Sequence, residues 1–161
     1  VVVSVTQINS GTRFNIIPEK SEFVGTIRTI NPNVRKSVSD QFLEICKSTA
    51  SAYGCTAEVE IINGYPVTVN SVNESEKAIK VAQGIVGETF VKTNLSPSMG
   101  AEDFAYMLEK KPGSYIWLGA GKPQAGSMLH NSRYDFNDKI IPLGVSYWEQ
   151  LVKHELKTSN T

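Results

Sequence analysis

The chain has 161 residues, of which 40% are hydrophobic and 20% are charged. These values are typical of a globular protein with enough chain to bury a core. The 16 basic and 16 acidic residues balance to a formal net charge of zero. Nucleic acids and anionic membranes usually require a basic patch, and no apolar run reaches the roughly 18 residues that span a bilayer. We therefore expect neither a nucleic-acid nor a membrane partner.

The first residue is Val1, and residues 1–5 have the β-branched character of an interior strand. Such a start fits either removal of a leader or a piece of a longer protein, and the motif order described below favours the second. The two cysteines, Cys46 and Cys55, lack a Cys-x-x-Cys spacing and indicate free thiols. We expect a reducing compartment, the cytoplasm.

Residues 1–62 predict the order β-β-β-α-β, or β-β-α-β if the second segment joins its neighbour. Four segments have the β-branched or alternating pattern of strands: 1–8, 14–17, 20–30 and 57–61. Gly25 is expected to mark a close approach between backbones. Asn31 is a candidate N-cap for a helix with an apolar stripe, and Gly54 is placed to end that helix.

The pattern changes near residue 63, which predicts a boundary. Three later segments predict helices: 74–86, 103–110 and a last helix that begins at Pro142. Its expected core face comprises Leu143, Tyr147, Leu151 and Val152. Two short apolar stretches predict strands: 90–91 and 115–118. The Gly/Pro-rich stretch 119–126 predicts a loop of the kind that often carries function.

The chain has only two histidines, His130 and His154. His154 lies in the last predicted helix between charged neighbours, which is typical of a solvated surface histidine. His130 lies in a loop before a polar and acidic segment, where an imidazole can bind a metal or carry a proton. One histidine cannot form a metal site by itself, because zinc takes about four ligands.

Glu102 and Asp103 form an adjacent acidic pair, and such carboxylates can hold a metal or transfer protons. The plainer interpretation is that Asp103 caps a helix. Separately, Gly100 just before this pair would allow the backbone to approach a ligand closely. Arg28 lies within a predicted strand and is either a solvated residue or a fork for a substrate carboxylate. Asn15, in an otherwise apolar segment, is equally open.

Three segments occur together in one order. They are 15–28, from Asn-Ile-Ile-Pro to Gly-Thr-Ile-Arg; 98–104, Ser-Met-Gly-Ala-Glu-Asp-Phe; and 129–138, from Leu-His-Asn to Asp-Phe-Asn-Asp. At this spacing they resemble the M20 metallopeptidase family, and most closely its amidohydrolase branch of N-acyl-amino-acid (aminoacylase-like), hippurate and auxin-conjugate hydrolases. The resemblance covers essentially the whole chain, as the C-terminal portion of such a protein.

The resemblance implies an α/β fold in two parts. Residues 1–63 are similar to part of a lid and dimerisation domain, a ferredoxin-like β-α-β-β-α-β sandwich. Residues 64–161 are similar to the C-terminal part of an α/β zinc-peptidase-like catalytic domain. We expect the strand at residues 1–8 to lie at a sheet edge and to pair with a second copy, giving a homodimer.

The resemblance also implies roles for four residues. His130 matches a metal ligand, and Asn15 and Arg28 match lid residues that reach substrate, with the arginine gripping its carboxylate. Gly100 matches a glycine that lines the substrate pocket. The parent enzyme of this family holds two divalent metal ions, usually zinc and sometimes manganese, cobalt or nickel. It cleaves the amide bond of an N-acyl amino acid or small peptide.

The family's other metal ligands and its general base match no residue of this chain, so we expect them upstream. We accordingly expect the chain alone to bind no metal stably, to contain no catalytic residue, and to be inactive. The alternative is a non-enzymatic dimerisation or binding module that retains the M20 fold. The upstream sequence, or the metal content of the longer protein, distinguishes the two.

Overall fold

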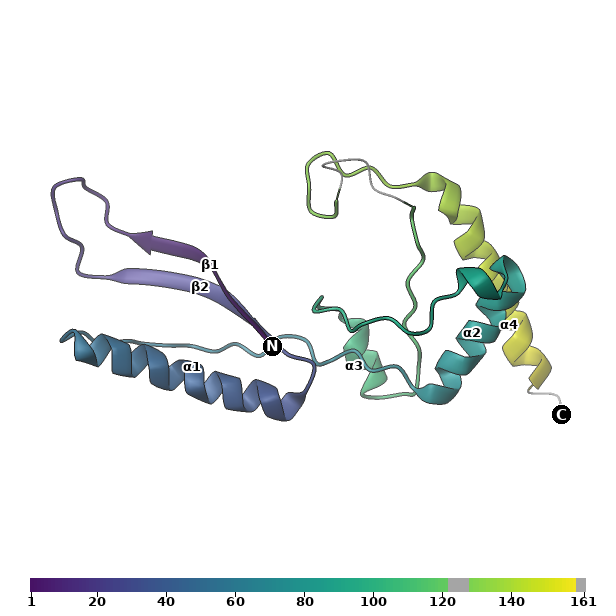
Figure 1. Ribbon diagram of the computed structural model, residues 1–161, viewed down its shortest axis with the longest axis horizontal. Coiled ribbons are helices and arrows are strands. Elements are labelled where there is room, and N and C mark those ends of the chain that lie inside the picture. Colours follow the sequence, from purple (N-terminus) through teal and green to yellow (C-terminus); the bar gives the residue numbers. More distant parts are fainter. Residues whose placement is uncertain (122–127, 159–161) are drawn as a thin grey trace. The chain divides into compact units, whose positions relative to one another are not determined.

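The computed structural model describes residues 1–121 and 128–158. These residues form two compact units (Figure 1). The first unit comprises 1–68 and 96–106, and the second takes its described residues from 69–95 and from the chain beyond 107. Most of the loop predicted at 119–126 lies outside the described residues.

A β-hairpin opens the first unit. Strand β1 (Val2–Ser10) pairs antiparallel with β2 (Ser21–Arg28), in a register that joins Val2 to Arg28 and Ser10 to Ser21 (Figure 1). The strands predicted at 1–8 and 20–30 are therefore confirmed. The register places Arg28 at the end of the hairpin where the chain leaves for the next helix.

The hairpin contains a bulge opposite a glycine. Val5 pairs with Gly25, but the next pair is Gln7 with Val24, so Thr6 is an extra residue on β1. A Cβ atom on Gly25 would overlap the Ser4 carbonyl oxygen and lie 3.1 Å from the Val5 Cα atom. The predicted close approach at Gly25 is thus confirmed, and the absence of a side chain there permits the bulged register.

Helix α1 (Pro32–Ala52) follows the hairpin and lies along it (Figure 1). The Asn31 side-chain oxygen accepts hydrogen bonds from the backbone N–H groups of Asn33 and Val34, as the N-cap prediction required. Just beyond the helix, Gly54 adopts a left-handed φ of 71°, which ends the helical backbone. The rings of Phe42 and Phe23 meet edge to face, 6.2 Å between centroids, and join α1 to β2.

Residues 96–106 return to the first unit through a cluster around two tyrosines. The rings of Tyr65 and Tyr106 meet edge to face at a centroid distance of 5.8 Å. The Tyr65 carbonyl oxygen accepts a 2.9 Å hydrogen bond from Arg35 Nη2 on α1. Beside Tyr106, Ala105 is fully buried within the short helix α3 (Phe104–Leu108). These contacts fix the start of α3 next to residues 64–65.

Two helices form the core of the second unit. Helix α2 (Val72–Val86) lies against α4 (Ile141–Thr158) (Figure 1). Their contact buries Ala78, Val81 and Tyr147. Short 3₁₀ turns precede or follow them at η1 (Glu88–Phe90) and η2 (Asp138–Ile140). Lys77 Nζ on α2 lies 3.0 Å from Glu155 Oε2 on α4, which adds an ion pair across the contact.

Hydrogen bonds join residues 70–71 to residues 113–115, although the two segments do not form a strand pair. The Asn70 side chain accepts from the Tyr115 backbone N–H at 2.8 Å and donates to its carbonyl oxygen at 2.9 Å. The Ser71 backbone N–H donates to the Gly113 carbonyl, and the Gly113 N–H donates back to the Ser71 hydroxyl. The Asn70 side chain thereby takes the place of a neighbouring strand's backbone, and these hydrogen bonds bring the start of α2 beside Tyr115.

Several of the strands predicted from the sequence are not formed. The structure gives no strand to four described segments: 14–17, 57–61, 90–91 and 115–118. The first is part of the hairpin loop, and the third belongs partly to η1. The fourth meets the Asn70 side chain instead of a strand. An alternating pattern indicates which face a strand would present, but a ladder also needs a neighbouring backbone, and the described residues supply one only for β1 and β2.

The helix predictions are confirmed, with one change in the expected core face of the last helix. Val152 on α4 is 54% exposed although it was assigned to the core, whereas Tyr147 is buried as expected. His154 is half-buried beside Glu155 and is not a fully solvated residue. The described chain is therefore a mixed structure of helices and strands. Within the two described ranges, we find no helix long and apolar enough to cross a membrane.

Replacing Gly25 tests the bulged register. Gly25→Ala should destabilise the chain by about 1–3 kcal/mol, because the new methyl group must displace the β1 backbone. The matched control is Gly84→Ala in α2, where a Cβ atom meets nothing within 4 Å and helix propensity should add about 0.5–1 kcal/mol. Urea unfolding should show opposite shifts in the two midpoints. An unchanged midpoint for Gly25→Ala would contradict the close approach.

The Lys77–Glu155 pair should make the stability of the second unit fall in acid. The hydrogen bond from Lys77 holds the pKa of Glu155 below its usual range. The resulting stabilisation is complete above the ordinary carboxyl pKa of about 4.3 and is lost as pH falls through the lowered value. Glu155→Gln should flatten the pH dependence of the urea midpoint below pH 5. Glu76→Gln, an exposed α2 carboxylate with no ion pair among the described residues, is the control.

Candidate functional site

Arg28 is fixed in position by the chain segment that carries Gly100. It is the last residue of β2, and its Nη1 atom donates a 2.8 Å hydrogen bond to the Met99 carbonyl oxygen. The residue remains exposed, and its guanidinium has further N–H donors that can bind an anion. The structure therefore brings two of the predicted site residues, Arg28 and Gly100, to the same place.

The segment around Gly100 is a turn stabilised by its own side chains. The Gly100 backbone N–H donates to the Ser98 hydroxyl at 3.2 Å, and a Cβ atom at Gly100 would lie 3.4 Å from the same oxygen. At the start of α3, Glu102 Oε1 accepts from the Phe104 N–H at 3.3 Å. The expectation that Asp103 caps this helix is wrong for its side chain: within the described residues, the neighbouring Glu102 supplies the capping oxygen.

Asn15 lies in the loop between β1 and β2. The loop residues beside it are strongly exposed, with Phe14 and Ile17 almost fully accessible to solvent. Within the described chain, no hydrogen bond holds the Asn15 side chain. The structure thus places Asn15 in the first unit, at the far end of the hairpin from Arg28, and does not bring the two side chains together.

His130 lies in a turn of the second unit and has a left-handed backbone. Its φ is 67°, a conformation in which histidine is enriched among non-glycine residues. The turn is closed by a hydrogen bond from the Asn131 N–H to the Met128 carbonyl. The Asn131 side chain then accepts from the Arg133 N–H at 2.9 Å. The imidazole is exposed on this turn, in the other unit from Arg28.

The described residues do not form a metal site by themselves. In 1–121 and 128–158, no group of three or more His, Cys, Asp or Glu side chains could hold one ion. Zinc in proteins takes about four ligands, so His130 could supply one donor to a centre whose other donors come from elsewhere. We therefore derive no reaction step through a metal from these residues.

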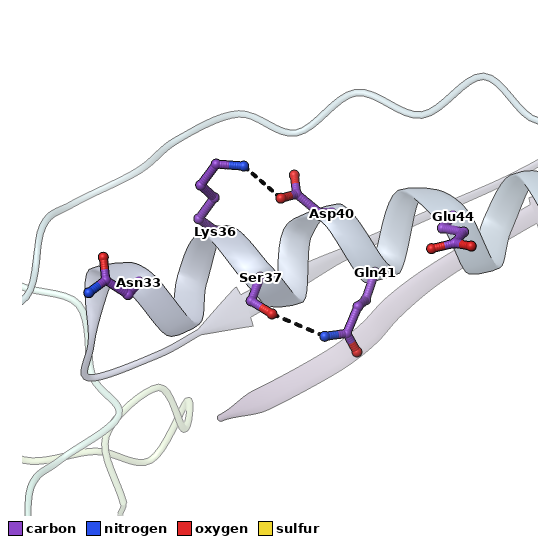
Figure 2. Close-up of a pocket in the computed structure, with 6 residues that line it drawn as sticks. All are labelled: Asn33, Lys36, Ser37, Asp40, Gln41 and Glu44. Atoms are coloured by element: carbon purple, nitrogen blue, oxygen red, sulfur yellow. Dashed lines mark hydrogen bonds and ion pairs between the residues drawn. The ribbon is translucent and has the colours of Figure 1, made fainter.

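A polar pocket along α1 offers a different candidate. It is lined by Asn33, Lys36, Ser37, Asp40, Gln41 and Glu44 (Figure 2). Figure 2 shows two pairs among these side chains along the helix, Lys36 with Asp40 and Ser37 with Gln41. The distances are 2.7 Å and 3.1 Å. Such i,i+4 pairs are ordinary for a solvated helix face. The pocket provides no convergent chemistry.

Comparison with known proteins gives the family. Residues 3–154 match the sequence profile of peptidase family M20/M25/M40. The match spans nearly the whole sequence, so this chain belongs to that family.

The chain spans only about two fifths of the length of the relatives described below. It is 38% identical over 146 residues to thermostable carboxypeptidase 2 of Saccharolobus solfataricus, which covers 89% of this chain and 36% of that protein. It is 33% identical over 156 residues to hippurate hydrolase of Campylobacter jejuni, covering 97% and 40%. The crystal structure of a dinuclear metal-binding M20 peptidase from Bacillus subtilis superposes with a TM-score of 0.77 at 29% identity, covering 98% of this chain and 42% of that one.

Sequence reasoning identified Arg28 and Gly100 separately but could not place them together. Arg28 and Met99 are 71 positions apart, and the partner atom is a backbone carbonyl, which leaves no signal in a sequence. The residues that reasoning missed are Arg35, Tyr65 and Tyr106, which hold the Gly100 segment in the first unit. Tyr65, between Gly64 and Pro66, was the one sign of that cluster available in the sequence.

Proposed function

We propose that this chain is part of a metal-dependent amidohydrolase that cleaves the amide bond of an N-acyl amino acid or a small peptide. Membership of the M20/M25/M40 peptidases supports hydrolytic chemistry. The names of the hippurate hydrolase and carboxypeptidase relatives support a substrate with a free carboxylate. The observation that carries the proposal is the exposed guanidinium of Arg28, held by the Met99 carbonyl beside Gly100.

The Arg28 geometry suits recognition of a carboxylate. One N–H donor is used by the Met99 carbonyl, which restricts where the guanidinium can lie. The remaining donors can form the two parallel hydrogen bonds that a planar carboxylate accepts, and such charge-assisted pairs are strong. In this proposal Gly100 lines the pocket beside the arginine, and Asn15 reaches substrate from the hairpin loop.

The proposed metal centre draws on His130 and on residues outside this sequence. The Bacillus subtilis neighbour, described as a dinuclear metal-binding peptidase, supports two ions in the complete enzyme. We propose zinc for them, with His130 as one ligand. Bound metal would polarise the amide carbonyl and activate water. This chain contributes only that metal ligand and the Arg28 contact with the substrate carboxylate. We propose that it is inactive alone.

We further propose the division of labour that the family implies. Residues 1–63 would be part of the lid and dimerisation domain, and residues 64–161 the C-terminal part of the catalytic domain. The separate clustering of residues 1–68 supports a lid, with residues 96–106 joined to it. The free thiols of Cys46 and Cys55 fit a reducing compartment, the cytoplasm.

Binding of the substrate carboxylate by Arg28 can be tested in a complete enzyme. Residues 1–161 would be joined to the part of Campylobacter jejuni hippurate hydrolase that they do not match, and the product loaded with zinc. Arg28→Lys should raise KM for N-benzoylglycine at least tenfold, about 1.4 kcal/mol or more, with a smaller change in kcat. Arg13→Lys, in the hairpin loop, should leave both constants unchanged.

Blocking the substrate carboxylate separates this role from a general loss of structure. The primary amide of N-benzoylglycine should be a poor substrate for the unsubstituted enzyme, and Arg28→Lys should not worsen it further. Equal KM values for the acid before and after substitution would contradict the proposed role of Arg28. Hydrolysis by residues 1–161 alone would contradict the proposal that the chain is inactive by itself.

Self-association through β1 can be measured directly. Its outer edge has no partner strand in the described chain, and exposed valines line the strand. Val3→Lys should weaken a dimer that pairs through this edge, because lysine opposes edge-to-edge pairing. Val69→Lys, at an exposed valine of the second unit, is the control. Sedimentation velocity at micromolar concentration should show the dimer lost only in Val3→Lys; a monomer for the unsubstituted chain would refute the pairing.

A further inference from the structure

An Asn-Gly pair lies in the exposed stretch between α1 and α2. Asn63 is the one asparagine of the sequence that is followed by a glycine, Gly64. Residues 62–65 are exposed and belong to neither a helix nor a strand, and a Cβ atom at Gly64 would meet nothing within 4 Å. Within the described chain, no hydrogen bond holds the Asn63 side chain or the Gly64 N–H. The side-chain amide can therefore approach the backbone nitrogen that follows it.

These two groups can react with each other without a cofactor. The Gly64 backbone nitrogen attacks Asn63 Cγ, which forms a bond between these two atoms. The bond from Cγ to Nδ2 breaks, and ammonia leaves with the proton that the Gly64 nitrogen gives up. Water then opens the resulting five-membered imide at either carbonyl carbon, giving aspartate or isoaspartate. Glycine favours the attack because it has no Cβ atom to crowd the nitrogen.

Three other asparagines precede the next smallest kind of residue in these pairs, a serine, and the structure restrains all three. Asn9 lies within the paired part of β1. The Asn70 side chain forms two hydrogen bonds with the Tyr115 backbone. The Asn131 side chain accepts a hydrogen bond from the Arg133 N–H. Each must give up its strand pairing or its hydrogen bonds before the same reaction can occur, whereas Asn63 need not.

Gly64 also belongs to the cluster that holds residues 96–106. Its carbonyl oxygen accepts a 3.4 Å hydrogen bond from the Tyr106 hydroxyl, and the next carbonyl, that of Tyr65, accepts from Arg35. Isoaspartate at position 63 routes the main chain through its side-chain carbon atoms, which lengthens the backbone directly before Gly64. Because the donors lie on α3 and α1, a longer backbone displaces the carbonyls from the groups that they bind.

We propose that Asn63 is a site of spontaneous deamidation, and that its isoaspartate product loosens the contact between residues 64–65 and residues 96–106. The Met99 carbonyl that Arg28 binds lies in the loosened segment. Modification of one exposed residue would thus release the partner of Arg28 without touching either side chain. The proposal rests on contacts within the first unit and not on the proposed hydrolysis, so either can fail while the other stands.

The first test follows each asparagine as residues 1–161 age in neutral buffer. Tandem mass spectrometry of proteolytic digests gives the rate at which each site gains the mass of aspartate. In the folded chain, Asn63 should react at least tenfold faster than Asn70 or Asn9. Gly64→Ala should slow reaction at residue 63 at least tenfold, and its methyl group has room because nothing lies within 4 Å. Comparable rates at Asn63 and Asn70 would overturn the proposal.

Guanidinium chloride separates protection by structure from the effect of sequence. In the unfolded chain, Asn70 and Asn9 should react at least fivefold faster than in the folded chain, while Asn63 should stay within twofold of its folded rate. A large acceleration at Asn63 would show that the fold restrains this residue, and the proposal would be wrong. Unchanged rates at Asn70 and Asn9 would also overturn it, because the described contacts would then give no protection.

Hydrogen exchange measures the loosening of residues 96–106. Aged chain enriched in isoaspartate at residue 63 by ion-exchange chromatography would be compared with fresh chain and with Asn63→Asp. This variant carries the same added charge without the longer backbone. Amide hydrogens of residues 96–106 should exchange at least tenfold faster in the aged chain, whereas Asn63→Asp should stay within twofold of the fresh chain. Equal exchange in aged and fresh chain, or equally fast exchange in Asn63→Asp, would refute loosening by the longer backbone.

Discussion

The packing of α2 against α4 is the contact on which the second unit depends. It buries Ala78, Val81 and Tyr147, and Lys77 and Glu155 form an ion pair across it. Burial of an aromatic side chain accounts for most of its stabilisation, since an ion pair whose side chains are about 40% exposed adds little. The same contact determines which side of α4 is buried and which side faces outward.

The first unit is organised around a close approach of backbones. Gly25 allows β1 to bulge at Thr6, and the resulting register places Arg28 at the end of the hairpin. The contact of Arg28 with Met99 then joins the hairpin to residues 96–106. A local constraint within the hairpin thus positions the side chain that we assign to substrate binding.

Helices could be predicted from this sequence because their signals are local. The Asn31 cap and the amphipathic pattern of 74–86 each lie within the segment that they organise. Strands could not be predicted equally well, because residues 57–61 and 115–118 carry the right pattern but pair with no strand among the described residues. Val152 shows a related limit. Its helical spacing is that of a core residue, but the sequence does not show which apolar face of α4 packs against α2.

The candidate site was predictable residue by residue but not as an arrangement. Arg28 was singled out because a strand arginine can act as a fork, and His130 because an imidazole in a polar loop can bind a metal. That Arg28 meets the Met99 carbonyl depends on tertiary structure alone. That His130 has a left-handed backbone could not be read from its residue type.

The bond between Arg28 and Met99 also has a kinetic consequence. It closes a chain loop of 71 positions, whereas the hairpin and α1 form through contacts much closer in sequence. Loop closure becomes entropically more demanding with length, so residues 96–106 should dock after the hairpin has folded and detach before it melts. Amide hydrogens of this segment would exchange with solvent through local opening, without unfolding of the strands. The arginine is therefore oriented by a part of the chain that can release it.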